Sequence, residues 1–295
     1  MRTPPWLMPA IVSPFDDAGE LDLDAHRHNV SLLAERGVEG FVIGGSNGES
    51  PYLEPGERAH LARATREVAP DAFVLVGIVA ESLRSAMELI AEVSDTDADA
   101  VLVTTPTTLV RHQPAMVERY YEDVATSSPL PVFLYSVPRV TAYDLALDSA
   151  TRLAEHPNVV GIKDSSGDLD RARALVATSL TVFVGSSAIA WPAVAAGAHG
   201  AITASANYAP ELAATVVALA LTGEETPLQA VLTAVSAAVE RHGVGAVKYA
   251  ATRAGLRCGS PRRPLESPDD KTTALIDAAL DEASRALGEA ARSAH

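Results

Sequence analysis

Residues 54–79 read EPGERAHLARATREVAPDAFVLVGIV and contain one unit of the pattern that decides the fold. The first part, Glu54 to Val68, has the apolar spacing of a helix and meets a stop signal at Pro70. The second part, Phe73 to Val79, is a short apolar run rich in β-branched residues, which is typical of a buried strand. The unit therefore predicts a helix followed directly by a strand.

The same alternation recurs along the chain. Strands are predicted at Met8 to Phe15, Phe41 to Gly45, Phe73 to Val79, Ala100 to Thr105, Val132 to Val137, Val159 to Lys163, Thr181 to Gly185 and Ala201 to Ala204. Helical segments such as Asp24 to Arg36, closed by Gly37, lie between them. This repetition predicts an α/β fold, a (β/α)8 TIM barrel. An open doubly wound sheet is the alternative, but its dinucleotide-binding form wants a G-x-G-x-x-G turn where residues 13–20 read SPFDDAGE.

After Thr222 the strand pattern stops. Three further helices are predicted at Pro227 to Arg241, Val244 to Ala254 and Pro268 to Leu287. We therefore expect a (β/α)8 barrel over residues 1–222 and a C-terminal helical region over residues 223–295, a three-helix appendage.

Composition narrows the classes of partner and compartment. The formal net charge of −15 over 295 residues predicts that nucleic acid and anionic membrane surfaces are repelled. The uncharged stretch Ala174 to Pro210 contains Ser, Thr, Gly and Pro, so it is interpreted as buried core rather than a membrane span. A single cysteine, Cys258, and an N-terminus without a secretory apolar region favour a cytoplasmic location.

Active sites of such barrels lie at the carboxyl ends of the strands. The residues predicted there include the loop Gly44 to Glu49, Tyr135, Lys163, Ser186 and Ile202. Ser186 follows the seventh predicted strand and Ile202 lies on the eighth, so both are candidate substrate-binding residues.

Lys163 is one of only three lysines, against 20 arginines, and lies in the apolar strand Val-Val-Gly-Ile-Lys. Alternation places it on the same face as Val159 and Gly161, so it points into the barrel if Val159 does. Burial disfavours a charged amine, and a neutral amine in a pocket is a nucleophile for ketones. The alternative is a lysine that extends to the barrel mouth and pairs with a carboxylate.

Tyr135 ends the adjacent predicted strand, within reach of Lys163 or of a substrate bound to it. Its phenol can carry the protons that carbinolamine formation and C–C cleavage require, although a strand-end tyrosine is commonly a core residue with a hydrogen-bonded tip. The loop Gly44 to Glu49 offers backbone N–H groups, the Ser46 hydroxyl and the Asn47 amide, a set that suits a carboxylate, although Asn-Gly also predicts a simple turn. Together these groups describe a site for a 2-oxo acid.

Four segments carry a family resemblance: GGSNGES (44–50), VFLYSVP (132–138), NVVGIKDSSGD (158–168) and GAHGAITASAN (197–207). They resemble the pyruvate-dependent class I aldolase family that includes dihydrodipicolinate synthase and N-acetylneuraminate lyase. The tail VKYAATRAGL (247–256) resembles the family's last helices. The variants GSNGE and YSVP are most similar to the branch that contains 4-hydroxy-2-oxoglutarate aldolase.

The resemblance implies a homotetramer in which Lys163 forms a Schiff base, Tyr135 relays protons, and Ser46 and Asn47 bind the pyruvyl carboxylate. The backbone carbonyl of Ile202 lines the pocket. The implied reaction is reversible cleavage of 4-hydroxy-2-oxoglutarate, or a related 4-hydroxy-2-oxo acid, to pyruvate and an aldehyde, without metal or organic cofactor. The alternatives within the family are 4-hydroxy-tetrahydrodipicolinate synthase and a sugar-acid aldolase or dehydratase.

The chain departs from the family pattern at three positions. Val140 stands where dihydrodipicolinate synthases carry an arginine for the carboxylate of the aldehyde substrate, Thr108 matches the second relay tyrosine, and Ala142 replaces a glycine. Thr108 and Arg139 are therefore candidates for binding the aldehyde part of the substrate. Arg111, His112 and Arg139 are candidate partners of a distal carboxylate, although most loop cations are solvated, the interpretation favoured here.

Three other functions compete with this prediction. The His26-x-His28 pair resembles a zinc motif, but residues two apart on a helix do not share a face, so surface histidines are expected. Cys258 has no activating histidine beside it and is expected to be inert. A non-catalytic barrel that binds an oxo acid is the alternative of another class, against which the presence of both Lys163 and Tyr135 argues.

Overall fold

The computed structural model describes residues 2–293, and within that range an 8-stranded parallel sheet forms a (β/α)8 barrel. The strands are β1 (Leu7–Pro9), β2 (Gly40–Ile43), β3 (Phe73–Ile78), β4 (Ala100–Thr104), β5 (Val132–Ser136), β6 (Val159–Asp164), β7 (Thr181–Val184) and β8 (Gly200–Thr203). They pair in the order β1-β8-β7-β6-β5-β4-β3-β2, and a parallel bridge between Ala10 and Val42 joins the two ends. The predicted TIM barrel is confirmed.

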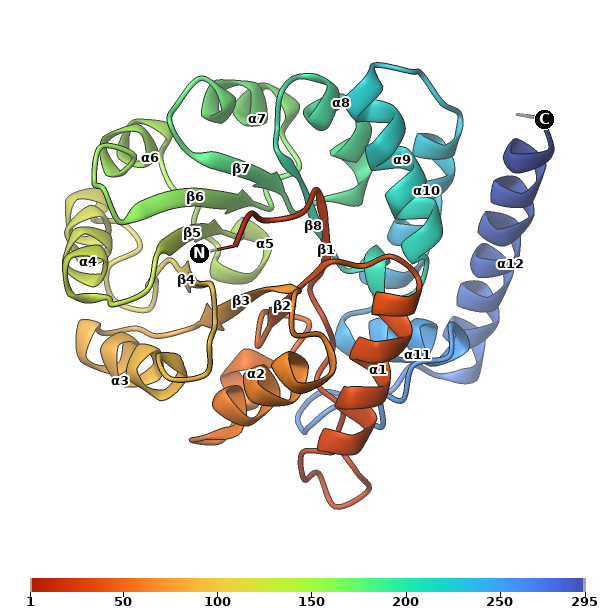
Figure 1. Cartoon of the computed structure of the whole chain (residues 1–295), viewed down its shortest axis with the longest axis horizontal. Helices are drawn as coiled ribbons and strands as arrows, with labels where there is room; N and C mark the ends of the chain where they lie inside the picture. Colours follow the sequence, from red (N-terminus) through yellow and green to blue (C-terminus); the bar gives the residue numbers. More distant parts are fainter. Residues whose placement is uncertain (1, 294–295) are drawn as a thin grey trace.

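Helices connect consecutive strands and surround the barrel (Figure 1). They are α1 (Leu23–Glu35), α2 (Glu57–Val68), α3 (Leu83–Val93), α4 (Pro114–Ser127), α5 (Pro138–Thr141), α6 (Leu147–Leu153), α7 (Leu169–Val176), α8 (Ala190–Ala195) and α9 (Pro210–Thr222), with short 3-10 turns η1 (Ser50–Tyr52), η2 (Ser187–Ile189) and η3 (Ser205–Asn207). Helix α1 begins where the Asp22 side chain accepts a hydrogen bond from the Ala25 N–H. It ends before Gly37, whose φ of 85° is the predicted left-handed conformation.

The first strand is shorter than predicted. Residues 10–15 are buried but lie outside β1, because much of their backbone pairs with other groups. The Asn207 side chain accepts a hydrogen bond from the Val12 N–H at 3.2 Å and donates to the Ala10 carbonyl at 2.9 Å. At Val12 a side chain thus takes the place of a neighbouring strand.

Three helices follow the barrel, as predicted: α10 (Leu228–Glu240), α11 (Val244–Arg253) and α12 (Asp270–Ser293). Helix α12 runs along one side of the molecule and packs against α10 and α11 (Figure 1). It extends beyond the predicted end at Leu287. The domain boundary at residues 222 and 223 stays a prediction, and residues 1, 294 and 295 of the two predicted domains lie outside the described part of the chain.

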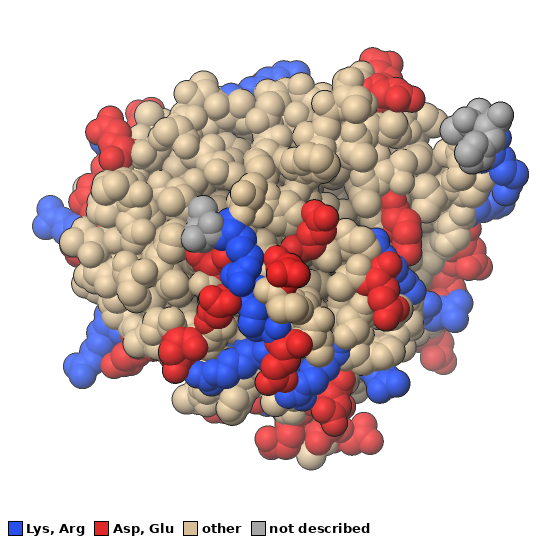
Figure 2. All heavy atoms as spheres, in the orientation of Figure 1, with Lys and Arg blue, Asp and Glu red and all other residues tan. Residues whose placement is uncertain are grey.

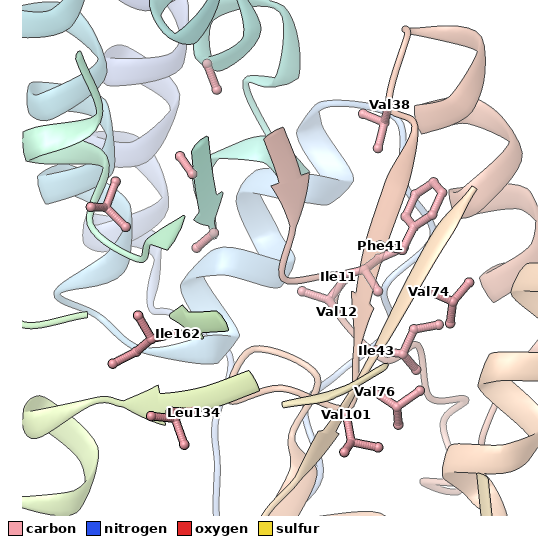
Figure 3. Packing of buried hydrophobic residues seen from close by; sticks show 14 of the residues in the cluster. Ile11, Val12, Val38, Phe41, Ile43, Val74, Val76, Val101, Leu134 and Ile162 are labelled. Atoms are coloured by element: carbon pink, nitrogen blue, oxygen red, sulfur yellow. The ribbon is translucent and has the colours of Figure 1, made fainter. Parts of the chain in front are cut away.

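Strand side chains alternate between two cores. Met8, Val42, Leu75, Phe133 and Phe183 belong to the core inside the barrel. The intervening residues pack between strands and helices, and Figure 3 shows them along β2, β3 and β4. The labelled members on these strands are Phe41, Ile43, Val74, Val76 and Val101. Period-2 alternation with both faces covered explains the continuous apolar runs.

Charged residues of both signs are intermixed on the face drawn in Figure 2, where they gather over the region around α1 to α3. No uninterrupted basic patch is visible on that face. Among the helices of residues 2–293, none combines the length and the apolar character that a membrane span requires.

Candidate functional site

A cavity of about 290 Å³ opens at the carboxyl ends of the strands. The side chains or backbone of seven predicted residues line it: Ser46, Asn47, Tyr135, Arg139, Lys163, Ser186 and Ile202. These residues come from five separate segments of the chain, and only the barrel brings them together.

Lys163 lies on β6 directly beside Tyr135 of β5 in the strand register. Its side chain is 4% exposed, and its Nζ is 4.6 Å from the centroid of the Tyr135 ring. No described residue accepts a hydrogen bond from this Nζ or forms an ion pair with it. Lys163 nevertheless lines the cavity. The alternative in which Lys163 pairs with a carboxylate at the barrel mouth is therefore not observed within residues 2–293.

The inward direction of Lys163 has a different origin from the one that simple alternation predicts. The register between β5 and β6 shifts between Val132 and Phe133, so Val159 packs in the outer core while Val160 contacts the inner one. The expectation that Val159 shares the face of Lys163 is wrong because of this bulge. Gly161 faces the Phe133 ring, and a Cβ at Gly161 would collide with that ring.

A second glycine makes room for the amine. A Cβ added at Gly185 would collide with Ser165 Oγ and lie 3.2 Å from Lys163 Cε. The bare backbone at Gly185 therefore lets the Lys163 side chain extend along the cavity wall.

Tyr135 is held at both ends. Its phenol oxygen lies 3.3 Å from Ser46 Oγ, and its backbone carbonyl accepts a hydrogen bond from Thr105 Oγ1 at 3.2 Å. Thr105 Oγ1 is also 3.0 Å from the Tyr121 phenol oxygen, and burial raises the pKa of Tyr121 above its usual value. Tyr121 therefore stays protonated, and its hydrogen bond with Thr105 helps to hold the end of β5 in place.

The loop after β2 is fixed by buried contacts. Gly44 and Glu49 have positive φ values of 60° and 56°. Ser13 Oγ donates to the Gly48 carbonyl at 2.8 Å, and Glu49 is 2.7 Å from the Lys248 ammonium. These contacts hold the Ser46 hydroxyl next to Tyr135, so the loop is not an isolated surface turn, and its binding of a carboxylate stays a prediction.

A larger cavity of about 410 Å³ adjoins the first. Five residues line both: Ser46, Asn47, Arg139, Val140 and Glu240. Thr104, whose hydroxyl has no hydrogen-bond partner among the described residues, also lines the larger cavity. The shared residues form the passage between the two spaces.

Glu240, the last residue of α10, was missed by sequence reasoning. Its Oε1 accepts a hydrogen bond from the Tyr208 phenol at 3.1 Å. Burial raises the pKa of the Glu240 carboxyl, while Tyr208, Arg139 and Lys163 lower it in part. No local motif points to a single glutamate far beyond the last strand, so only the fold reveals that it lies at the site.

The candidate residues for the aldehyde part lie in different places. Arg139 is exposed, lines both cavities, and donates from Nη1 to the Glu240 carbonyl at 3.3 Å. Thr108 is also exposed, lies outside both cavities, and donates its backbone N–H to Glu81 Oε2 at 2.8 Å. Arg111 and His112 likewise line neither cavity. Of these four residues, Arg139 is placed to meet a ligand within this chain.

The expectation of surface histidines is wrong for His26. Its ring is fully buried, with Nε2 2.8 Å from Thr65 Oγ1, because this face of α1 packs against α2. Burial lowers the pKa of His26 to about 4. His28 lies apart from it, 3.2 Å from the Gly255 carbonyl, and within residues 2–293 no group of three His, Cys, Asp or Glu residues is arranged to hold a metal ion.

Cys258 is buried, and burial raises the pKa of its thiol to about 11. A thiol that stays protonated is a poor nucleophile. The inertness of Cys258 stays a prediction, which its burial and raised pKa support.

The chain matches the family model described as "Dihydrodipicolinate synthetase family" over residues 5–283. It is 34% identical to 4-hydroxy-tetrahydrodipicolinate synthase 1 of Streptomyces coelicolor, covering 95% of this chain and 94% of the relative. It is 31% identical to 4-hydroxy-tetrahydrodipicolinate synthase of Methanothrix thermoacetophila, covering 96% and 98%. The fold is similar to the chloride-inhibited dihydrodipicolinate synthase of Acinetobacter baumannii complexed with pyruvate, with a TM-score of 0.90, 31% identity and coverage of 96% and 99%.

Proposed function

The chain belongs to the dihydrodipicolinate synthetase family, whose members are pyruvate-dependent class I aldolases, and from that premise we propose that Lys163 forms an imine with a 2-oxo acid. The enzyme is a carbon–carbon lyase. The proposed reaction is reversible cleavage of 4-hydroxy-2-oxoglutarate, or a related 4-hydroxy-2-oxo acid, into pyruvate and an aldehyde. The chemistry needs no metal and no organic cofactor, because the lysine itself supplies the electron sink.

One observation carries this proposal: Lys163 Nζ borders a cavity, has no ionic partner among the described residues and lies against the Tyr135 ring. The amine attacks the ketone carbon, and water leaves as the imine forms. Breaking the C3–C4 bond then sends an electron pair to the iminium nitrogen and leaves the enamine of pyruvate. Tyr135, beside the Ser46 hydroxyl, moves protons in the imine-forming steps.

The remaining cavity residues hold the pyruvyl group. Ser46 and Asn47 offer a hydroxyl, an amide and backbone N–H groups to its carboxylate. Ser186 and the Ile202 carbonyl face the same space from β7 and β8. The volume of about 290 Å³ accommodates a pyruvyl group with a short extension.

The second carboxylate of 4-hydroxy-2-oxoglutarate is assigned to Arg139. This is the one cation that lines both cavities among the described residues, and a guanidinium matches a carboxylate in geometry. Thr108 keeps its sequence-based assignment to the aldehyde part only as a prediction, because its side chain lies outside both cavities.

Condensation of pyruvate with aspartate semialdehyde is the second candidate. It is favoured by the names of the relatives, which are 4-hydroxy-tetrahydrodipicolinate synthases. Val140 argues against it, because this 61% exposed side chain at the cavity passage offers no hydrogen bond to a carboxylate. A sugar-acid aldolase or dehydratase is the third candidate.

We also propose the homotetramer that the family resemblance implies. The 86% exposed Leu109 and the 53% exposed Met116 are large apolar side chains near the barrel mouth, and contact with another copy would remove them from water. Light scattering coupled to size-exclusion chromatography measures the mass, and a monomer at working concentration contradicts the proposal.

The decisive experiment traps the imine. The protein is incubated with pyruvate, reduced with borohydride and mapped by mass spectrometry, with Lys163→Ala as the control. A stable adduct on Lys163 is expected, and an adduct elsewhere or none in folded protein leaves a binding-only barrel as the better account. Pyruvate release from 4-hydroxy-2-oxoglutarate, glucarate-derived 2-oxo acids and N-acetylneuraminate, together with aspartate semialdehyde condensation, then ranks the substrates.

A further inference from the structure

The turn after β6 forms part of the wall around Lys163. Its residues Ser165, Ser166 and Gly167 all line the cavity of about 290 Å³ that contains the amine. The turn is also close to the lysine side chain, because a Cβ added at Gly185 would meet both Ser165 Oγ and Lys163 Cε. A shift of this turn would therefore change the space that is available to a molecule bound to the amine.

The Asp164 carboxylate holds this turn in place. Asp164 directly follows Lys163 in β6, and its side chain is 1% exposed. Its Oδ1 accepts hydrogen bonds from the Ser166 backbone N–H, at 3.1 Å, and from the Ser166 hydroxyl. Asp164 itself does not line the cavity, so its influence on the cavity passes through Ser166.

Arg171 of α7 is the ionic partner of Asp164. Its Nε donates to Asp164 Oδ2 at 2.7 Å, and its side chain is 12% exposed. The same guanidinium donates from Nη2 to the Leu145 carbonyl at 2.5 Å, and its Nε lies 3.5 Å from Asp144 Oδ1. Asp144 and Leu145 belong to the segment that follows α5, a helix whose residues line both cavities. Arg171 therefore connects two parts of the cavity wall that are separate in sequence.

The end of β5 belongs to the same hydrogen-bond network. The Ser136 carbonyl accepts the Ser165 N–H at 2.8 Å, and the Ser136 hydroxyl donates to Asp144 Oδ1 at 3.1 Å. The Leu145 N–H donates to this hydroxyl at 3.3 Å. Because Ser136 directly follows Tyr135, the network also reaches the strand end that carries the phenol beside Lys163.

The shape of the guanidinium explains why an arginine suits this position. A buried ion pair is by itself weak evidence for stability, because apolar residues of similar volume can stabilise a fold equally well. An arginine differs from an apolar residue, and from a lysine, in presenting a planar fork of N–H groups with fixed directions. The fork of Arg171 is directed at a carboxylate of β6 and at a carbonyl after α5. These contacts fix the position of one wall segment relative to the other.

We propose that Arg171 is a positioning residue, which holds the turn 165–167 and the segment after α5 at the spacing that pyruvate binding requires. It acts through Asp164 and the Leu145 carbonyl and touches no substrate atom, since Arg171 lies outside both cavities. The inference rests on the proposed imine at Lys163. Without the guanidinium the two wall segments lose their fixed spacing, so pyruvate binds less often in a productive geometry while the chemistry of the amine is retained.

The initial rate of borohydride trapping, measured against pyruvate concentration, separates binding from chemistry. In Arg171→Met the half-saturating pyruvate concentration is expected to rise by about tenfold, while the maximal rate per folded protein stays within about twofold of the wild type. A purely structural role predicts the reverse, namely less folded protein with an unchanged half-saturating concentration. The matched control is Arg173→Met on the same helix, where the 57% exposed Arg173 pairs with Asp170 at 2.9 Å. An equal shift in this control would overturn the proposal.

A second variant, Arg171→Lys, distinguishes the geometry of the fork from its charge. It keeps a cation beside Asp164 but cannot reach the same set of acceptors in fixed directions. It is expected to keep most of the wild-type stability in urea titration, and yet to show at least about a threefold increase in the half-saturating pyruvate concentration. A half-saturating concentration equal to that of the wild type would mean that charge alone suffices, and it would overturn the positioning role.

The outcomes are separable from those of the imine proposal. Absence of an adduct in the wild type refutes the function of Lys163. A normal adduct in the wild type, with an unchanged half-saturating concentration in folded Arg171→Met, refutes the role of Arg171 alone. If Arg171→Met fails to fold, Asp164→Asn/Arg171→Met removes the unpaired buried charge, and the same shift is required of this double variant. If the double variant also fails to fold, the result for Arg171→Lys decides.

Discussion

Two buried lysines occupy different regions of this barrel and have different surroundings. Lys163, 4% exposed at the carboxyl end of β6, borders a cavity and has an aromatic ring beside it but no carboxylate partner among the described residues. Lys248, 1% exposed on α11, lies 2.7 Å from Glu49 Oε1, donates to the Ser260 carbonyl at 3.0 Å and covers the Phe15 ring. Burial alone therefore does not distinguish an amine that borders a cavity from one held in an ion pair.

The two sites differ in two respects: Lys248 has an ionic partner, and Lys163 borders a cavity. The Glu49–Lys248 ion pair connects the loop after β2 to the C-terminal region, so this pair has a structural role. Among the described residues Lys163 has no such ion pair, and it borders a cavity instead. The comparison predicts that loss of Lys163 harms activity and loss of Lys248 harms stability.

The largest effect is expected from Lys163→Met. Without the amine no imine forms, so turnover of the best substrate should fall by at least about 10³-fold, as is typical when a covalent nucleophile is removed. The free energy of unfolding should change little or rise, because a buried amine without an ion pair is replaced by an apolar chain of similar length. Urea titration and steady-state rates measure both quantities, with Lys271→Met, on exposed Lys271 of α12, as the control. A strong loss of stability contradicts the comparison.

Lys248→Met should have the opposite signature. It leaves Glu49 buried without its cation, and breaking a buried pair in this way costs about 3–5 kcal/mol of the free energy of unfolding. Glu49 also accepts the Arg262 N–H at 2.8 Å, which moderates the loss. The double variant Lys248→Met/Glu49→Gln removes the unpaired charge and should recover a large part of the stability in urea titration. If the double variant is no more stable than the single one, the ion pair is not what the lysine contributes.

His26 is a third buried basic group, and it differs from the two lysines because burial favours its neutral form. Its pKa is lowered by burial from an ordinary value of 6.5 to about 4, so the unfolded chain binds a proton more readily than the folded one. The contribution of His26 to stability is therefore full above pH 6.5 and is lost as pH falls towards 4, by about 3 kcal/mol in total. Unfolding in urea at a series of pH values measures the loss. His26→Gln cannot titrate and should show a shallower acid slope, and equal slopes would refute the assignment.

The sequence anticipates the features that local patterns encode. Seven of the predicted strands fall close to their observed positions because the apolar runs are continuous and end at polar residues, as in Val132–Ser136 and Val159–Asp164. Lys163, Tyr135 and Ser46 were found because each follows or ends such a run, and strand ends converge in a barrel.

What escaped the sequence depends on contacts between distant segments. The Asn207 side chain ends β1 early, the bulge beside Val132 turns Val159 outwards, and packing against α2 buries His26. Glu240 reaches the site because α10 packs against η2 and η3, which follow β7 and β8, and nothing in its neighbouring residues indicates that position. Such positions follow from tertiary packing, which the periodicity of the local sequence does not encode.

The smallest effect is expected from Arg139, the cation that differs from both lysines in being exposed. Because water and salt screen an exposed guanidinium, its contact with a distal carboxylate is worth up to about 1 kcal/mol, or about fivefold in KM. Arg139→Ala should therefore raise the KM for 4-hydroxy-2-oxoglutarate by that factor, with kcat and pyruvate trapping on Lys163 nearly unchanged. The increase should shrink in high salt, since screening already weakens the wild-type contact. Arg111→Ala, at a position outside both cavities, is the matched control. An equal KM for the two variants would mean that Arg139 is a solvated loop residue. Substrate selection would then depend on Lys163, Glu240 and the cavity shape.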